Sequence, residues 1–471
     1  MSNNTIAAIS TPLGPGGIGI VRISGIRAFA IMKRLFVREK KGVRPIGKSF
    51  IERPLSSHVV YYGHLIEPES GIILDEVLAI YMKAPKSFTR EDVVEFHSHS
   101  GFVVLDRILN VVVDAGATLS GPGEFTKRAF LNGRIDLTQA EAVIDLINAP
   151  CETAVQMASC QVAGGLRDRL DGVSRSILKL MACCEASIEF NEAAEVDCES
   201  NLKNIQMTLR HSILPDVSLL IQRQKDTAIF HDGALLAIAG VPNVGKSSLL
   251  NRLVERETAI VSEVPGTTRD IVREYFSING VPVVVCDTAG IHDTKDPVEC
   301  IGIKKARDHF HQADIVLLVL EATRTLNDFE INLIEEFGSS KTIVVINKDD
   351  LAGEEIVLSI QNMIKGIPHI RVSAKSGTGI DDLKALIFKD LFSGESIVGN
   401  ERVTPNLRQR KILEKVKRQL ERCMIATETE QSVVVVSEML NGSLLLLDEI
   451  SGSRKQEDLY DHIFSQFCIG K

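Results

Sequence analysis

The chain has 471 residues, enough for several domains, and 44% of them are hydrophobic, enough for ordinary buried cores. Its formal net charge of -9 argues against a protein that coats nucleic acid over its whole surface. Nine cysteines are scattered without a Cys-x-x-Cys pair, which speaks against a zinc ribbon or a disulfide framework and indicates a reducing compartment. The first residues lack a basic segment followed by an apolar core, and no apolar run approaches membrane-spanning length. We therefore expect a globular, cytoplasmic protein without membrane contact.

Residues 1–121 alternate short β-branched runs with turns, which predicts a compact α+β domain. The expected strands are residues 18–23, 58–62, 76–82 and 93–97, with two helical stretches between strands. A glycine-rich run at residues 14–19 contains no Gly-Lys-Ser. We favour tight turns with close backbone packing there, the alternative being a second nucleotide loop.

Apolar residues recur at helical spacing over residues 122–230 and again over residues 393–471. The second segment is too short for a strong core of its own, so it should pack against the first. Between them, residues 231–392 alternate strand with helix, which is typical of a parallel, doubly wound sheet. The predicted architecture is a discontinuous all-α helical domain with an α/β domain inserted into it.

Residues 240–248 fit the phosphate-binding pattern G-x-x-x-x-G-K-S/T and follow an apolar run that reads as a strand. In that setting the glycines let backbone N–H groups approach a polyphosphate, Lys246 reaches the β- and γ-phosphates, and Ser247 ligates Mg²⁺. The alternative is a chance match in a glycine-rich turn.

Further signals of a GTPase follow along the chain. Asp287-Thr288-Ala289-Gly290 ends a second apolar strand, with a carboxylate for the Mg²⁺ shell and a glycine N–H that senses the γ-phosphate. Thr268 lies between the two motifs and is placed to complete the metal shell. Asp350, in Asn347-Lys348-Asp349-Asp350, can accept from both N1–H and N2–H₂ of guanine, a donor pair that adenine lacks. Ser373-Ala374-Lys375 would close over the base.

These signals predict a guanine nucleotide site of the Ras-like phosphate-loop type that uses Mg²⁺. The residues expected to bind GTP are Asn243, Val244, Gly245, Lys246, Ser247, Ser248, Ser262, Glu263, Val264, Pro265, Gly266, Thr267, Thr268, Asp287, Thr288, Ala289, Gly290, Asn347, Lys348, Asp350, Ser373, Ala374 and Lys375.

Several segments outside these motifs carry a family resemblance. They are Arg-Ile-Ser-Gly at residues 22–25, Pro-Gly-Glu-Phe-Thr-Lys-Arg-Ala-Phe-Leu-Asn at residues 122–132, Gly-Thr-Thr-Arg-Asp at residues 266–270 and Phe-Cys-Ile-Gly-Lys at residues 467–471. In this order, with the inserted GTPase, they closely resemble the MnmE (TrmE) family of tRNA modification GTPases. The resemblance covers nearly the whole chain.

The resemblance implies a homodimeric GTPase that forms a heterotetramer with MnmG, a partner that uses FAD and NADH. Together they would add a carboxymethylaminomethyl group at carbon 5 of the wobble uridine of certain tRNAs. The one-carbon unit would come from a reduced folate, 5,10-methylene- or 5-formyl-tetrahydrofolate, held by the N-terminal domain, which also provides the dimer contact.

The family's folate-contacting positions match Arg22, Glu95, Arg134 and Lys471. A family lysine often stands at the place of Arg134, so the charge is retained with a different geometry. Taken without the family, Arg22 reads as an edge-strand residue and Glu95 as the polar face of a strand. His97 and His99 have no third ligand nearby, and we assign no metal site to them.

The residue after the Asp-Thr-Ala-Gly element is Ile291, where Ras-like enzymes place a water-orienting glutamine, and no arginine finger is evident. The resemblance implies a potassium ion in the role of such a finger. Its ligands would be Asn243, Ser262, Val264 and Thr267. A cation beside the β/γ bridge would offset the negative charge that develops there.

The remaining candidates are catalytic. Counting along the switch places the family's water-positioning glutamate at Glu299, the alternative being a helix cap. Cys300 stands where relatives often carry arginine. We place Arg269 and Asp270 with Glu299 among the catalytic candidates. Cys468 reads as a thiolate in the uridine chemistry or as a small apolar packing residue.

Two other functions remain open on the sequence. One is a GTP-dependent switch in ribosome assembly or RNA binding, although no basic RNA-binding module is evident in the flanks. The other is a folate-dependent one-carbon transferase whose GTPase domain is regulatory. Potassium-stimulated hydrolysis, retention of a reduced folate and co-purification with a flavoprotein would distinguish these from the MnmE-like function.

Overall fold

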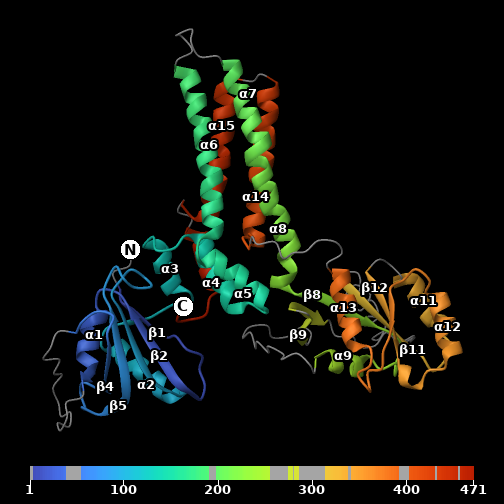
Figure 1. The fold of residues 1–471 in the computed structure, drawn as a ribbon. Helices are drawn as coiled ribbons and strands as arrows, with labels where there is room; N and C mark the ends of the chain where they lie inside the picture. Colours follow the sequence, from blue (N-terminus) through green and yellow to red (C-terminus); the bar gives the residue numbers. More distant parts are fainter. Residues whose placement is uncertain are drawn as a thin grey trace, which may run out of the picture. The chain divides into compact units, whose positions relative to one another are not determined.

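The computed structural model describes residues 4–38, 55–189, 198–254, 274–278, 280–285, 313–337, 341–391, 402–429, 432–453 and 457–471. The chain divides into two compact units. The first comprises residues 1–144, 162–201 and 429–471, and the second comprises residues 145–161 and 202–428. Figure 1 labels many of their helices and strands.

The first unit contains a seven-stranded sheet in the order β3-β4-β5-β6-β2-β1-β7. Neighbouring strands are antiparallel except β1 and β7, which run parallel. The strands are β1 (Ile6–Ile9), β2 (Gly16–Ser24), β3 (Phe36–Arg38), β4 (Val60–Ile66), β5 (Ile73–Met82), β6 (Val93–Ser100) and β7 (Thr118–Leu119).

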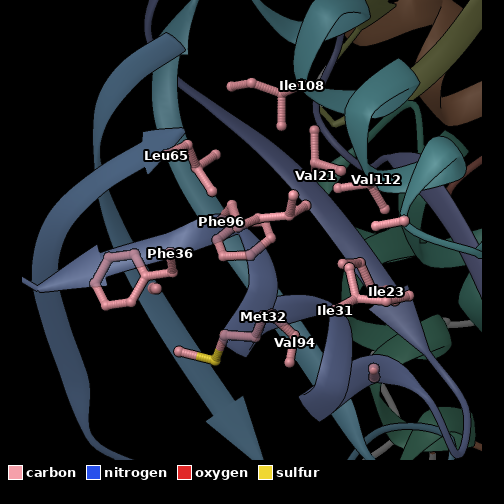
Figure 2. Close-up of a cluster of buried hydrophobic side chains, with 14 of the residues drawn as sticks. Val21, Ile23, Ile31, Met32, Phe36, Leu65, Val94, Phe96, Ile108 and Val112 are labelled. Atoms are coloured by element: carbon pink, nitrogen blue, oxygen red, sulfur yellow. The ribbon is translucent and has the colours of Figure 1, made fainter. Parts of the chain in front are cut away.

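Helices α1 (Ala28–Leu35) and α2 (Phe102–Asp114) contribute to one apolar core with the sheet. Figure 2 shows Phe36 and Phe96 in this core with Met32 of α1 and Ile108 of α2. Burying a side chain of this size stabilises a fold by about 1.5–3 kcal/mol. Because side chains alternate along a strand, the polar residues between the buried ones point to the other face of the sheet.

The first unit also contains helices that follow the sheet and helices from the end of the chain. They are α3 (Glu124–Leu131), α6 (Gly165–Glu189), α15 (Val433–Ser451) and α16 (Glu457–Ser465), and α4 (Leu137–Asn148) begins there. Leu137 and Ala140 of α4 pack with Tyr460 and Phe464 of α16. Helix α6 packs along α15.

The second unit contains a six-stranded sheet in the order β13-β12-β11-β8-β10-β9. It is parallel except for the β9–β10 pair. Its strands are β8 (Ala234–Ala239), β9 (Glu274–Ile278), β10 (Val281–Val285), β11 (Ile315–Glu321), β12 (Thr342–Asn347) and β13 (His369–Arg371).

Helices cover both faces of this sheet. Apolar residues of α9 (Lys246–Val254) and α13 (Ile380–Leu391) join one core with Leu236 and Ile238 of β8. Residues of α11 (Asp328–Phe337) and α12 (Glu354–Met363) join a second core with Ala237 and Ala239. Alternate residues of β8 thus belong to opposite cores, which is the arrangement of a doubly wound parallel sheet.

Helix α8 (Leu214–Asp232) packs against α14 (Leu407–Glu428) in the second unit. It is preceded by α7 (Cys198–Thr208) and by a π-helical turn, η1 (Leu209–Ile213), while α5 (Glu152–Val162) lies earlier in the chain. In both α6–α15 and α8–α14, a helix before the six-stranded sheet pairs with one after it. The chain is therefore multidomain, with an α+β N-terminal part, a discontinuous helical part and an inserted α/β domain, as predicted.

The glycine-rich run at residues 14–19 leads into β2 and not into a helix. A Cβ atom at Gly19 would lie 2.6 Å from Leu105 Cδ2, so the strand and α2 approach closely because glycine stands there. This agrees with the close-packing interpretation and not with a second nucleotide loop. The prediction missed β1, β3 and β7, which have four residues or fewer. No helix in the described ranges combines the length and apolar composition needed to cross a bilayer.

Candidate functional sites

The phosphate loop lies where the sequence predicts it, between the carboxyl end of β8 and the start of α9. Its backbone needs positive φ angles, 145° at Gly240 and 96° at Gly245. A Cβ atom at Gly240 would lie 2.5 Å from the Val319 carbonyl oxygen, and one at Gly245 would clash with Asn347 Nδ2. The two glycines therefore let the loop lie against β11 and β12 with its backbone free to approach an anion.

Lys246 Nζ donates to the carbonyl oxygens of Gly240 and Val241, at 2.8 and 2.9 Å. Burial lowers the pKa of this ammonium. The two carbonyl oxygens are neutral acceptors. The charged oxygens of a polyphosphate would be stronger partners for this ammonium. Ser247 and Ser248 are exposed at the first turn of α9, and Asn243 is exposed with φ 63°.

Asn347 connects three loops at this edge of the sheet. Its side chain is buried, with Nδ2 donating to the Val244 carbonyl at 2.7 Å and Oδ1 accepting from the Ala374 N–H at 3.0 Å. Its own carbonyl accepts from the Ala322 N–H at 2.9 Å. The phosphate loop and the two segments predicted to contact guanine are thus joined through one amide side chain.

Asp350 is exposed and accepts a hydrogen bond from Ser373 Oγ at 2.7 Å. The Ser373 hydroxyl also accepts from the Ser376 N–H at 3.2 Å, which orients it toward the carboxylate. Lys348 has φ 62°, and its Nζ donates to Glu321 Oε1 at 2.8 Å. Lys375 is exposed beside them. The structure therefore brings the two segments that carry Asp350 and Ser373 together, as the prediction of a shared guanine site requires.

Three residues that the sequence prediction missed support this group of residues. Arg252 of α9 donates to the carbonyl oxygens of Ala374 and Lys375, at 3.1 and 2.8 Å. Arg371 Nε lies 2.6 Å from Asp349 Oδ1. Burial raises the pKa of Glu321, but the hydrogen bonds from Lys348 and Thr323 outweigh it and lower the pKa. The only sequence feature that could have marked Glu321 as a site residue is its position at the carboxyl end of an apolar strand.

Several predicted site residues lie outside the described ranges. They are Ser262, Glu263, Val264, Pro265, Gly266, Thr267, Thr268, Arg269, Asp270, Asp287, Thr288, Ala289, Gly290 and Glu299.

A second group of predicted residues meets on the polar face of the seven-stranded sheet. Arg22 of β2 and Glu95 of β6 are direct cross-strand partners, with Arg22 Nε 2.8 Å from Glu95 Oε1. His97 Nε2 lies 3.1 Å from Glu95 Oε2. Burial raises the pKa of Glu95, but the hydrogen bond from His97 and the charge of Arg22 outweigh it and lower the pKa. The carboxylate is therefore ionised at neutral pH and offers acceptors only.

Two aromatic rings connect this pair with the other predicted residues. The Arg22 guanidinium carbon lies 5.7 Å from the centroid of Phe125, and that of Arg134 lies 4.7 Å from the centroid of Phe88. Both rings belong to one small apolar cluster with Ile6 and Ala8. Such stacking orients guanidinium groups while leaving their N–H donors available.

The segment at residues 468–471 lies against this cluster. Ser10 Oγ and Arg22 Nη1 both donate to the Gly470 carbonyl, at 3.1 and 3.5 Å. The Lys471 carbonyl accepts from the Phe125 N–H at 3.2 Å. Cys468 is exposed. Arg22, Arg134 and the backbone of Lys471 therefore contact the two phenylalanines of one aromatic cluster, and Glu95 is joined to it through Arg22. The sequence prediction missed the two rings, Ser10 and Gly470.

Comparison with known proteins gives the family. Residues 5–134 match the family model described as the GTP-binding protein TrmE N-terminus, and residues 137–468 match the MnmE helical domain. A tRNA modification GTPase MnmE from Acetivibrio thermocellus is 40% identical over 468 residues, 99% of each chain. One of the same description from Carboxydothermus hydrogenoformans is 39% identical over 475 residues, 100% of each chain.

Solved structures of GTPase domains match a smaller region. The G domain of the T. maritima FeoB iron transporter is 28% identical, over 34% of this chain and 99% of that one, with a TM-score of 0.27. Era from Aquifex aeolicus, bound to GDP and aluminium fluoride, is 28% identical, over 39% of this chain and 66% of that one, with a TM-score of 0.29. From the two family models and the full-length relatives, the chain belongs to the MnmE family of tRNA modification GTPases.

Proposed function

We propose that this chain is a potassium-activated GTPase of the cytoplasm that modifies tRNA. As a homodimer, and in a heterotetramer with the flavoprotein MnmG, it adds a carboxymethylaminomethyl group at carbon 5 of the wobble uridine. A reduced folate supplies the one-carbon unit. The single observation that carries this proposal is the full-length match to tRNA modification GTPases, whose motifs coincide with two assembled polar sites.

The nucleotide site supports the GTPase part. The residues present fit a guanine nucleotide, because the loop glycines adopt positive φ angles that let backbone N–H groups approach a phosphate, and Asp350 is exposed for the base. Ser247 and Thr268 would hold Mg²⁺, which neutralises charge between the β- and γ-phosphates when bound. Lys246 would exchange its loop carbonyls for phosphate oxygens. Glu299 would position water, and Arg269 and Asp270 would act nearby.

The exposed Asn243 supports potassium activation. Its left-handed backbone turns the side chain of a loop residue outward at the phosphate-binding end of β8. Together with Ser262, Val264 and Thr267 it would hold K⁺. The cation would supply the positive charge that an arginine finger provides in other GTPases.

The Arg22–Glu95 pair supports folate binding. The ionised carboxylate of Glu95 suits the N–H donors of the pterin ring, and arginines suit the carboxylates of the glutamyl tail. Lys471 would add a further positive charge. Cys468 is exposed in the same terminal segment as Gly470 and Lys471, which makes it available for chemistry on the uridine.

The homodimer is supported by an apolar face on the first unit. Val60 and Tyr62 of β4 and Leu78 of β5 are 55%, 46% and 39% exposed, and Tyr62 and Leu78 are cross-strand partners. Exposed apolar side chains gathered on one sheet face commonly mark a contact with another protein.

The proposal is tested in cells that lack the chain and then regain it. Mass spectrometry of wobble uridines should show loss and recovery of the carboxymethylaminomethyl group. Purified protein should hydrolyse GTP much faster in K⁺ than in Na⁺ and should retain a reduced folate. Unchanged uridines would refute the tRNA function, while equal rates in the two salts would refute potassium activation alone.

A further inference from the structure

Helix α14 carries a charge opposite to that of the whole protein. Its 22 residues include seven basic and three acidic side chains, a net charge of +4, whereas the complete chain has a net charge of -9. Both proposed ligand sites lie on other elements. The charge of α14 therefore has no role in the function proposed so far.

Four of the basic residues form a stripe along this helix. Lys411, Lys415, Arg418 and Arg422 are all exposed and are separated by four, three and four residues. Because each residue of an α-helix turns the chain by about 100°, these positions lie within about 60° of one another and span about 16 Å. We name them the basic stripe.

The rest of α14 shows why the stripe faces solvent. Ile412, Leu413, Val416 and Leu420 are buried on the other side of the helix, and α14 packs against α8. The packing that holds the helix in the second unit therefore does not involve the stripe. Charge on the stripe can be changed with little effect on the core.

The four stripe residues have no acidic partner among the residues that the structure describes. Two other basic residues of α14 do, since Arg410 lies 3.4 Å from Glu414 and Lys417 lies 3.9 Å from Glu421. Like charges three or four residues apart on a helix repel each other. The four stripe residues repel one another, and the acidic residues of α14 pair with other side chains. A ligand with several negative charges in a row would relieve this repulsion.

We propose that the basic stripe binds the phosphate backbone of the tRNA substrate. This inference rests on the proposed function, which makes tRNA the substrate, and adds the surface that holds it. Lysine and arginine side chains neutralise phosphates and release their counterions, which gives an affinity that falls with salt. Contacts of this kind position an RNA without reading its sequence. The stripe would therefore hold the tRNA body, while base recognition lies elsewhere.

The test compares four variants of the full-length protein. In the first, all four stripe residues are changed to glutamine. In the second, charge is retained by Lys411→Arg, Lys415→Arg, Arg418→Lys and Arg422→Lys. The third variant carries only K411Q and K415Q. The fourth, a matched control, carries Arg175→Gln and Lys179→Gln, because Arg175 and Lys179 are exposed and four residues apart on α6.

Binding of an unmodified tRNA transcript is measured at several salt concentrations, with GTP hydrolysis without tRNA as a check on folding. We expect the four-glutamine variant to bind about 100-fold more weakly at low salt, with a log–log salt slope shallower by about 3. The charge-retaining variant and the α6 control should stay within about twofold of the parent, and K411Q/K415Q should lie between.

Equal affinity and slope for the four-glutamine variant and the parent would overturn the inference, and so would an equal loss in the α6 control. If tRNA binding is unchanged but capture of MnmG is lost, the stripe binds an acidic protein surface and the RNA assignment is wrong. Failure of the parent itself to bind tRNA would instead refute the proposed function.

Discussion

Asn347→Ala removes the side chain that joins the phosphate loop to the two segments proposed to contact guanine. The Val244 carbonyl and the Ala374 N–H lose their partner, and both residues are buried. A buried backbone group left without a hydrogen bond costs about 1–3 kcal/mol, so two cost about 2–6 kcal/mol. If about 3 kcal/mol of this cost opposes the ordering of the loops around GDP, the Kd for GDP rises roughly 100-fold.

The assay is titration of the full-length protein with a fluorescent GDP analogue in the presence of Mg²⁺. Thr342→Val is the matched control, because Thr342 is a buried polar residue at the opposite end of the same strand, away from the loops. We expect the control to bind GDP like the parent even if its melting temperature falls. If Asn347→Ala binds within threefold of the parent, the reasoning is wrong, since the three loops would then not depend on that amide.

Three other predictions concern the proposed catalytic and folate-binding residues. Glu299→Ala should abolish GTP hydrolysis and leave GTP affinity nearly unchanged; an equal loss of affinity by titration would show a structural role. Cys468→Ser should spare GTPase activity and impair tRNA modification, and unchanged modified uridine by mass spectrometry would count against it. The folded pKa of Glu95 lies below its ordinary 4.5, so its ion pair stabilises the protein above that pH and the effect is lost as the pH falls through the folded pKa. Glu95→Gln should therefore lower the melting temperature at pH 7 but converge with the parent in acid, and a constant difference down to low pH would contradict this.

The placement of the phosphate loop between β8 and α9 was predictable because its motif is local. The pattern at residues 240–248 needs only a strand, a turn and a helix start, which neighbouring residues determine. The sequence could not show that Asn347 bonds to Val244, 103 residues away, or that Arg252 supports the backbone of Ala374. Such contacts depend on which strands become neighbours in the sheet.

The polar site of the first unit was predictable only through the family. Arg22 and Glu95 are 73 residues apart and become partners through the register of β2 and β6. Ser10 and Gly470 are 460 residues apart. Neither Phe125 nor Phe88 has a local pattern that distinguishes a ring under a guanidinium from an ordinary core residue. The short strands β1, β3 and β7 were missed because two to four residues are too few to show a period.

The sequence by itself determined the order of the domains and the chemistry of the nucleotide loop, because helical and strand periods and phosphate-loop glycines act over a few residues. Only the tertiary structure decided which polar groups meet: Asn347 with two loops, Glu95 with both Arg22 and His97, and Gly470 with Ser10. The physical reason is that strand register and helix packing are set by burial of the apolar side chains. The polar residues on the opposite faces then take whatever neighbours that packing provides.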